Sequence, residues 1–303
     1  MTPAIAAPAA DAGVAPVSRS PTRLAVRRFV RNRRALASAG LLALIGLATL
    51  AVPLLSPLDY REQDFDYTLG RPNGRYWMGT DALGRDLFVR LFLGGRISFA
   101  VGLLATTVSV ALGLAYGSVS AFAGGRTDNL MMRLVDVLYG LPTMLIIIIV
   151  MAFLRSRSVV TVFVVIGLFG WLTLARIVRG QVLSVKELAF VEAARALGVR
   201  AGPIIWRHMI PNILGPVIIY STLSVPAAML SESFLSFLGL GVSEPETSWG
   251  VLISEGANAL GTERNYWWLV AFPGAALALT LYCLNSIGDG LRDSFDVQQR
   301  QDR

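Results

Sequence analysis

Six apolar runs, each close to membrane-spanning length, constrain this chain more than any other feature. They cover residues 35–55, 97–123, 134–154, 159–178, 213–238 and 267–287. About 20 apolar residues in a helix cross the hydrocarbon core of a bilayer. Hydrophobic residues make up 54% of the chain and charged residues only 16%, which fits a membrane protein better than a soluble domain. We therefore predict an all-α, polytopic membrane protein with six transmembrane helices.

The remaining segments divide the chain further. Residues 1–22 are rich in Ala and Pro without periodicity, which predicts a disordered cytoplasmic tail. The arginine-rich residues 23–34 are expected to form a short interfacial helix before the first span. A polar extracytoplasmic loop is expected at 56–95, a five-helix core at 96–291 and a cytoplasmic tail at 292–303.

The third apolar run carries a proline. Pro142 inside this run predicts a kink or break in the span. Asp128, in the short turn before it, is a plausible helix cap. In the second run, small residues recur at roughly helical spacing, which suits close packing against another helix. They are Gly102, Ala105, Ser109, Gly113 and Gly117.

A charged segment, residues 187–212, lies between the fourth and fifth runs. A helix over 187–197 would place apolar side chains on one side. These are Phe190, Ala193, Ala194 and Leu197. Glu192 and Arg195 fall on the other side, three apart and able to pair.

The same segment contains signals for a turn and a second helix. Gly198 suits a left-handed cap at the end of the first helix. Pro203 fits the first turn of a second short helix, which Pro211 is predicted to close. Such a segment cannot span a bilayer, so it must present itself to something in the aqueous phase.

This pattern resembles the EAA loop of the permeases of ABC importers. The resemblance implies a cytoplasmic coupling-helix loop that docks into a groove on an ATPase. The residues implied in this ATPase coupling are Glu192, Ala193, Ala194, Arg195, Gly198 and Pro211. The general pattern has Ile at the position of His208 and Leu at that of Ile210; the form found here is similar to the dipeptide and oligopeptide branch. An amphipathic loop without a docking role is the alternative.

Other strings resemble the C-type permease of dipeptide, oligopeptide and nickel importers. They are Gly79–Asp86, Ser236–Gly241, Ser248–Gly250 and Gly288–Asp293. Members of the family often continue with Asp-Pro, whereas Asp296 is followed by Val297 here. The resemblance, over about residues 23–296, implies a heterodimer with a second permease subunit. It also implies two cytoplasmic ABC ATPase subunits and an extracytoplasmic peptide-binding protein.

The implied function is that of a permease subunit that forms half of the translocation pathway for di- and oligopeptides. Nickel chelates and other small solutes stay open as cargo, because selectivity in such systems belongs largely to the binding protein. The implied location is the plasma (inner) membrane, in contact with lipid. The net charge of +7 could suggest nucleic acid, but the basic residues lie between apolar runs, which favours a topology signal.

The chain is predicted to carry no catalytic, cofactor or metal site of its own. A Walker A motif needs Gly-Lys-Ser/Thr, whereas the only lysine, Lys186, lies between Val185 and Glu187. ATP and Mg²⁺ are therefore expected on partner ATPase subunits. The single histidine, His208, and the single cysteine, Cys283, offer no disulfide and no zinc or haem site. A membrane-embedded enzyme would need a nucleophile and a base within reach of each other, and His208 lies far from any span centre.

Glu232, in the fifth run, is the most interesting acidic residue. A secondary transporter or channel, the other alternative, would want ionisable residues near mid-membrane. Asp136, Glu232 and Asp289 all lie towards span ends. An unpaired Glu232 would cost about 2.5–3.5 kcal/mol to insert, so it should face protein or water. A structural hydrogen bond near the outer surface and a contact with substrate or binding protein both stay open.

Charge distribution predicts the orientation. Six spans put both termini on one side, and with that side as the cytoplasm the inner segments hold about twice as many basic residues as the outer ones. We therefore expect both termini and His208 in the cytoplasm, with Asp81 and Trp249 outside. The first outer loop weakens this bias with its arginines, but its acidic residues balance them.

Overall fold

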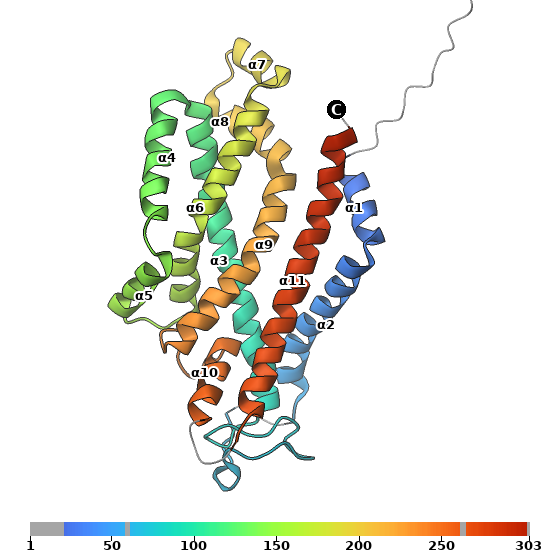
Figure 1. The fold of residues 1–303 in the computed structure, drawn as a ribbon, viewed down its shortest axis with the longest axis vertical. Helices are drawn as coiled ribbons and strands as arrows, with labels where there is room; N and C mark the ends of the chain where they lie inside the picture. The colour runs from blue at the N-terminus through green and yellow to red at the C-terminus, as the bar shows by residue number, and fades with distance from the viewer. Residues whose placement is uncertain (1–20, 58–60, 261–264, 302–303) are drawn as a thin grey trace, which may run out of the picture.

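The computed structural model describes residues 21–57, 61–260 and 265–301 of the chain (Figure 1). The predicted tail 1–22 lies almost wholly outside these residues. The described part is a bundle of long helices in which the only β-type pairing is one isolated bridge, between Thr80 and Asp86. The all-α prediction is therefore confirmed.

Within the described residues, five helices are long and apolar enough to cross a membrane. They are α2 (Arg33–Leu55), α3 (Leu87–Ala123), α6 (Val159–Lys186), α9 (Ile210–Phe237) and α11 (Trp268–Gln301). A sixth span is a broken pair, α4 (Gly125–Tyr139) and α5 (Thr143–Leu154), which meet at an angle of 79°. The predicted number of six is reached when this pair counts as one span.

The break between α4 and α5 lies where the proline predicted it. Pro142 is the N-cap of α5, because it has no N–H to donate and disfavours helical backbone at Leu141 before it. The start of α4 was not predicted correctly. Gly124, at φ +66°, is its N-cap, and Asp128 does not cap it. The Asp128 carboxylate instead accepts a hydrogen bond of 2.5 Å from the Ser120 hydroxyl of α3.

The loop predicted at 56–95 is shorter than expected. It contains the 3₁₀ turn η1 (Phe65–Tyr67) and ends at Asp86, whose carboxylate accepts a hydrogen bond of 3.1 Å from the Val89 N–H and so caps α3. The first turns of α3 carry Arg90 and lie within the segment that was predicted as a loop. That side chain is buried and neutralised by acidic partners, so the helix extends into the loop region.

Two further elements differ from expectation. Helix α10 (Trp249–Ala259) was not predicted; Ser248 caps it, and the buried Trp249 ring donates from Nε1 to the Leu91 carbonyl at 2.8 Å. Helix α11 continues to Gln301, through most of the predicted tail at 292–303.

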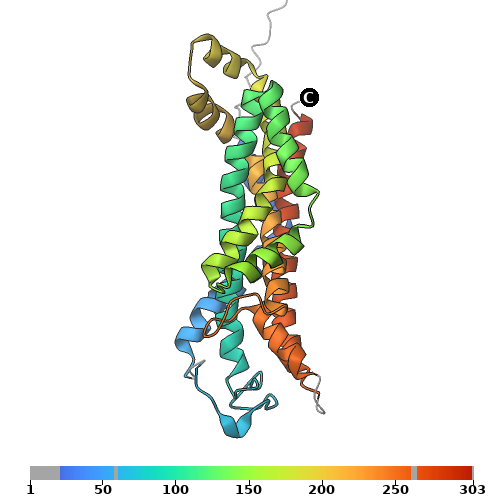
Figure 2. The same cartoon turned by 90° about the vertical axis from the view of Figure 1, so that its left-hand side faces the viewer.

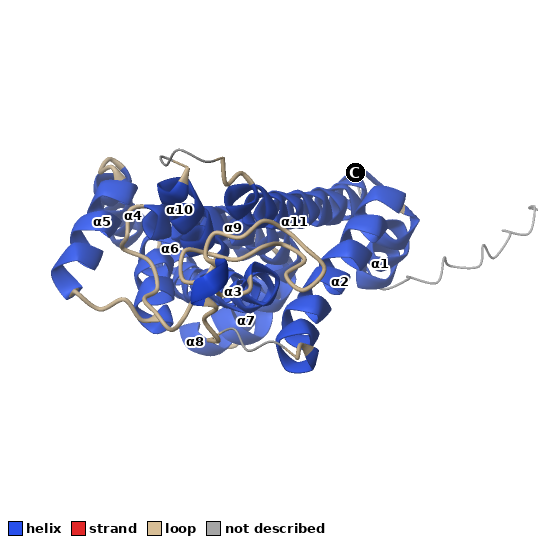
Figure 3. Cartoon of the chain, turned by 90° about the horizontal axis from the view of Figure 1, so that it is seen from below, coloured by secondary structure: helices blue, strands red, loops and turns tan. Residues whose placement is uncertain are grey.

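The predicted basic helix is present as α1 (Pro21–Arg31), which packs against α2 and α11. Its place at a membrane interface stays a prediction. Seen along the bundle (Figure 3), α1 and α2 lie at one edge and α4 and α5 at the other. Between these edges, α3 packs against α2, α6, α9 and α10.

The small residues of α3 allow a close approach to α6, as predicted. A Cβ on Gly113 would lie 2.6 Å from the Leu174 Cβ, and one on Gly117 would lie 2.5 Å from the Ala175 carbonyl oxygen. On the facing helix, a Cβ on Gly167 would lie 2.8 Å from the Ala105 carbonyl oxygen. Glycine at these positions therefore lets the two backbones come together.

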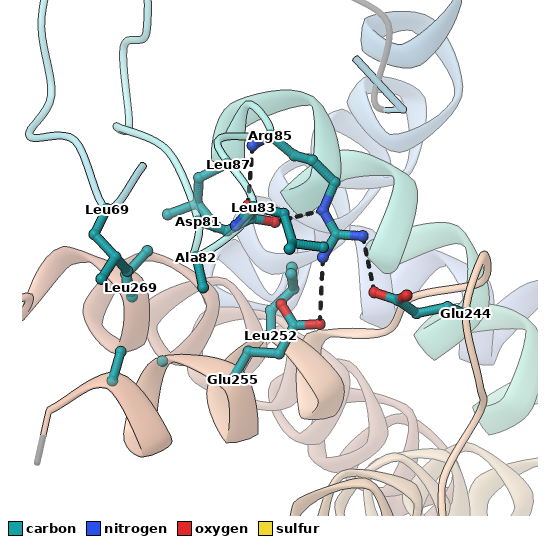
Figure 4. Close-up of a pocket in the computed structure, with 12 residues that line it drawn as sticks. Leu69, Asp81, Ala82, Leu83, Arg85, Leu87, Glu244, Leu252, Glu255 and Leu269 are labelled. Atoms are coloured by element: carbon teal, nitrogen blue, oxygen red, sulfur yellow. Dashed lines mark hydrogen bonds and ion pairs between the residues drawn. The ribbon is translucent and has the colours of Figure 1, made fainter. Parts of the chain in front are cut away.

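An ionic cluster joins the elements at the end of the bundle that carries residues 61–86. We define it as Asp81, Arg85, Arg90, Glu244 and Glu255. Arg90 contacts Asp81 and binds Glu255 with both terminal nitrogens, at 2.7 and 3.0 Å. Arg85 binds Asp81 at 2.7 Å and Glu244 at 2.8 Å (Figure 4). The cluster thus ties the loop and α3 to α10 and the segment before it.

Arg90→Ala is expected to destabilise the protein strongly. The change removes a buried guanidinium that neutralises Asp81 and Glu255; Asp81 keeps Arg85, so the loss of these charge-assisted hydrogen bonds should cost about 1.5–3 kcal/mol. Arg75→Ala is the control, because the Arg75 side chain is 62% exposed and lies 4.0 Å from Asp64; it should change stability by about 0.5 kcal/mol or less. Thermal unfolding in detergent measures both. Equal unfolding temperatures for the two variants would contradict the structural role of the cluster.

Candidate functional site

The 187–212 segment lies at the opposite end of the bundle from the ionic cluster. It contains α7 (Ala189–Ala196), α8 (Ala201–Pro203) and the π-helical turn η2 (Ile204–Met209), and it connects α6 to α9. Figure 2 shows this part of the chain standing out to one side of the long helices. The segment is therefore anchored at both ends while its middle projects from the bundle.

The predicted left-handed conformation of Gly198 is confirmed, with φ at +75°. Two hydrogen bonds close the turn: the Gly198 N–H donates to the Arg195 carbonyl at 2.9 Å, and the Val199 N–H donates to the Ala194 carbonyl at 3.1 Å. This pair of bonds is the Schellman motif, which satisfies carbonyls at a helix end. A Cβ on Gly198 would meet no atom within 4 Å, so backbone conformation alone requires glycine here.

Of the predicted apolar side of the first helix, only Ala194 is buried. Val191 and Ala194 are buried in a core group with residues of α3, α6, η2 and α9. Phe190 and Leu197 are instead 40% and 84% exposed. A helical wheel gives the angles between side chains but not the side that meets the bundle. Leu197 also lies just past the last turn of α7, as its C-cap.

The charged side chains of α7 also differ from expectation. The predicted pairing of Glu192 with Arg195 is not among the ion pairs of the described residues. Arg195 instead lies over the Phe122 ring near the end of α3, 4.8 Å from the ring centre. Glu192 is exposed. Arg195 therefore joins α7 to α3.

Pro211 does not close a second short helix, contrary to the prediction. The chain runs without a break from α8 through η2 into α9, with Pro211 in the first turn of α9. Proline cannot donate to the carbonyl four residues earlier, and its ring clashes with that carbonyl. The preceding turn widens, so that the Ile210 N–H bonds the Ile205 carbonyl five residues back. The helix continues because the wider π-helical turn accommodates the proline ring and its missing N–H.

Lys186 is a site residue that the sequence did not reveal. Its ammonium donates to the carbonyls of Ala121 and Phe122, at 2.8 and 2.9 Å. These carbonyls belong to the last turn of α3, where a cation also interacts favourably with the helix dipole. Since some 65 residues separate the partners, no local pattern could have paired them.

A second set of interactions between helices lies next to the hydrogen bonds of Lys186. Arg179 of α6 binds both carboxylate oxygens of Asp128, at 2.7 and 2.6 Å. The same carboxylate accepts the hydrogen bond from Ser120, so the three residues join α3, α4 and α6. A bidentate pair of this kind fixes geometry as well as charge. Helix α6, which leads into the 187–212 segment, is therefore held to α3 and α4 at this end of the bundle.

Glu232 lies far from this segment, close to the start of α10. Its side chain is fully buried and accepts hydrogen bonds from the hydroxyls of Ser236, at 2.7 Å, and Ser248, at 2.6 Å. Ser248 is also the N-cap of α10, so Glu232 helps to hold that helix against α9. This geometry supports the structural role. A direct contact of Glu232 with substrate or with a binding protein stays a prediction.

In residues 21–57, 61–260 and 265–301, no three His, Cys, Asp or Glu side chains are grouped as metal ligands. Cys283 is buried in α11, and His208 lies in η2. The residues described above form a projecting segment and a set of hydrogen bonds and ion pairs between helices.

Comparison with known proteins places the chain among transport proteins. Residues 109–301 match the family described as binding-protein-dependent transport system inner membrane component. Residues 20–72 match the N-terminal TM domain of oligopeptide transport permease C.

Relatives from several bacteria align over most of the chain. The oligopeptide transport system permease protein OppC of Haemophilus influenzae is 46% identical over 91% of this chain and 88% of its own length. The protein of the same name from Escherichia coli K12 is 46% identical over 90% of each chain. The dipeptide transport system permease protein DppC of Bacillus subtilis is 42% identical over 94% of this chain and 88% of its own.

The hydrogen bonds of Glu232 generate a stability prediction. Glu232→Ala leaves two serine hydroxyls without their acceptor and should cost about 1–3 kcal/mol. Glu232→Gln keeps an oxygen that can accept both bonds, so its loss should be smaller than that of the alanine variant. Glu246→Ala, which removes an exposed carboxylate nearby, is the control. The fraction of folded protein after heating in detergent ranks the three. A glutamine variant as unstable as the alanine variant would show that charge, rather than hydrogen bonding, holds this site together.

Proposed function

The chain belongs to the family of binding-protein-dependent transport system inner membrane components, and we propose that it is the C-type permease of a peptide importer. As a member of this family it is a transmembrane subunit of an ABC importer and not an enzyme, and other subunits of the importer hydrolyse ATP. Peptides are the proposed cargo, because the relatives named above are oligopeptide and dipeptide permeases.

One observation carries the coupling role of the 187–212 segment. Helix α7 is fixed to the bundle by Val191 and Ala194, while Phe190 and Leu197 point their apolar side chains away from this core. Exposed apolar side chains on a rigid, projecting helix suit insertion into a groove of another protein. We assign that groove to a cytoplasmic ATPase.

The proposed ATPase-coupling residues divide by task. Glu192 and Ala193 face outward and would contact the ATPase, whereas Ala194 and Arg195 hold α7 to the bundle. Gly198 turns the chain back, and Pro211 sets the π-helical turn that leads into α9. A displacement of α7 would be transmitted to α3 through the Arg195–Phe122 contact and to α6 through the packing of the buried Val191.

The proposed assembly has four kinds of chain. This subunit pairs with a second, different permease; each permease contacts one ATPase; and a peptide-binding protein docks on the outer side. The 187–212 segment would then face the cytoplasm, together with both termini. The basic residues near this end of the bundle support that orientation.

The coupling role predicts different effects for two changes at Gly198. Gly198→Val places a β-branched residue at φ +75°, which adds roughly 1–2 kcal/mol of strain, whereas Gly198→Asn suits this conformation. We expect the valine variant to reach the membrane at normal abundance with loss of peptide-stimulated ATP hydrolysis and of uptake. The asparagine variant should stay close to wild type. Gly202→Ala is a matched control, because Gly202 has ample space and no positive φ.

Substitution of an exposed side chain tests the docking surface without changing the geometry of the turn at Gly198. Leu197→Asp alters an exposed side chain and should leave the permease folded while it weakens ATPase co-purification. Glu192→Lys should act similarly by reversing the charge of the outward face. Wild-type coupling in the Gly198→Val, Leu197→Asp and Glu192→Lys variants would show that this segment is only a connecting loop.

Thiol labelling tests the orientation. In a variant without Cys283, single cysteines replace Trp77, which is 68% exposed in the loop, or Arg126, which is exposed in the first turn of α4. A membrane-impermeant maleimide should label the Trp77 position from outside and the Arg126 position only after the membrane is opened. The reverse pattern would overturn the proposed topology.

A further inference from the structure

A cavity of about 360 Å³ lies halfway along the bundle, between α3, α5, α6 and α9. Its position follows from the residues that line it. Thr106, Gly170 and Leu223 are close to the centres of α3, α6 and α9. These helices are of membrane-spanning length, so the cavity lies at the depth of the membrane interior.

The lining of this cavity is uncharged and combines hydroxyl groups with apolar side chains. No Asp, Glu, Lys, Arg or His is among the lining residues, whereas hydroxyl side chains from all four helices are. Glu232, although it follows the lining residue Ser231, is turned to Ser236 of α9 and to Ser248 at the start of α10. Hydroxyl groups among apolar side chains, without any charge, suit an occupant that carries both hydrogen-bonding groups and apolar surface.

One of these hydroxyls is unsatisfied. Thr106 is 7% exposed, and its hydroxyl has no hydrogen-bond partner among the described residues. A buried hydroxyl without a partner costs free energy, the more so at membrane depth. The neighbouring Ser109 hydroxyl, by contrast, donates to the Gly167 carbonyl at 2.9 Å. Thr106 therefore offers a hydrogen bond that the protein alone does not use.

Helix α9 supplies acceptors on the other wall. Tyr220, Ser224 and Ser231 lie four and seven residues apart, which places them on one face of the helix. The Ser224 and Ser231 hydroxyls donate to the carbonyls four residues back, at 2.8 and 2.9 Å. Their oxygens keep free lone pairs that can accept. The cavity thus offers both a donor and acceptors.

We propose that this cavity is a section of the translocation pathway that binds the backbone of a passing peptide. The inference rests on the proposed peptide import. Every peptide unit carries one N–H donor and one C=O acceptor, whatever its side chain, except at proline. Hydroxyl groups on the wall can bond these groups in any sequence, and a wall without charge does not distinguish a basic from an acidic side chain by the sign of its charge. Discrimination by side-chain charge must then come from elsewhere in the importer.

Charge placed on the wall tests this proposal. Ser231→Asp and Ser231→Lys are assembled with the wild-type partner subunits and binding protein. Uptake of Ala-Ala-Ala, Ala-Lys-Ala and Ala-Glu-Ala is then measured relative to the wild-type complex. The ratio of basic to acidic peptide uptake should shift by roughly tenfold, in opposite directions in the two variants. The same changes at Thr222, on the same helix but outside the lining, should leave the ratio unchanged.

A second pair of variants tests the proposal even if the charged Ser231 variants do not assemble with their partner subunits. Thr106→Val keeps the side-chain shape and removes the hydroxyl, so uptake of all three peptides should fall several-fold and to a similar extent. Thr107→Val removes an exposed hydroxyl that already donates to the Leu103 carbonyl, and should have little effect.

The outcomes separate the two proposals. A wild-type complex that imports none of the three peptides contradicts the proposed function. Import by the wild type, with unshifted ratios in both Ser231 variants or with equal shifts at Thr222, overturns the inference alone. If the charged variants do not assemble, wild-type uptake by Thr106→Val overturns it.

Discussion

The close contact between α3 and α6 is the interaction on which the rest of the structure depends. Glycines on both helices let the backbones approach to a distance at which a single added Cβ would clash. Helix association in a bilayer relies on such packing, because lipid tails are as apolar as the side chains they would replace. With α6 fixed to α3, the 187–212 segment that follows α6 has a fixed starting point.

Helix α3 also connects the regions to which we assign different tasks. Its first turns hold the ionic cluster through Arg90, its centre contributes Thr106 to the cavity, and its last turn receives Lys186. Helix α7 contacts the same last turn through Arg195 and Phe122. In the proposed importer, a displacement at the ATPase would therefore reach the pathway through one continuous helix.

Two prolines show how neighbours decide what one residue does. Pro142 follows Gly140 and Leu141, and the chain turns through 79° there. Pro211 lies in a helix whose preceding turn can widen, and the helix continues as a π-helical turn. Both residues lack the N–H and clash with the carbonyl four residues back. The break at Pro142 was predicted. The prediction for Pro211 was wrong, because a sequence pattern does not show whether the backbone hydrogen bonds of the preceding turn can shift from four residues back to five.

The sequence by itself determined the helical architecture, since a chain in a bilayer must satisfy its backbone hydrogen bonds internally and long apolar runs do so as helices. It also determined the left-handed turn at Gly198, which depends on local conformation. Only the tertiary structure decided which side of α7 is buried, which partners neutralise Arg90, and where Lys186 and Glu232 form their hydrogen bonds. These contacts join different elements, in most cases far apart in the chain, so they follow from how the helices pack and not from any pattern along one of them.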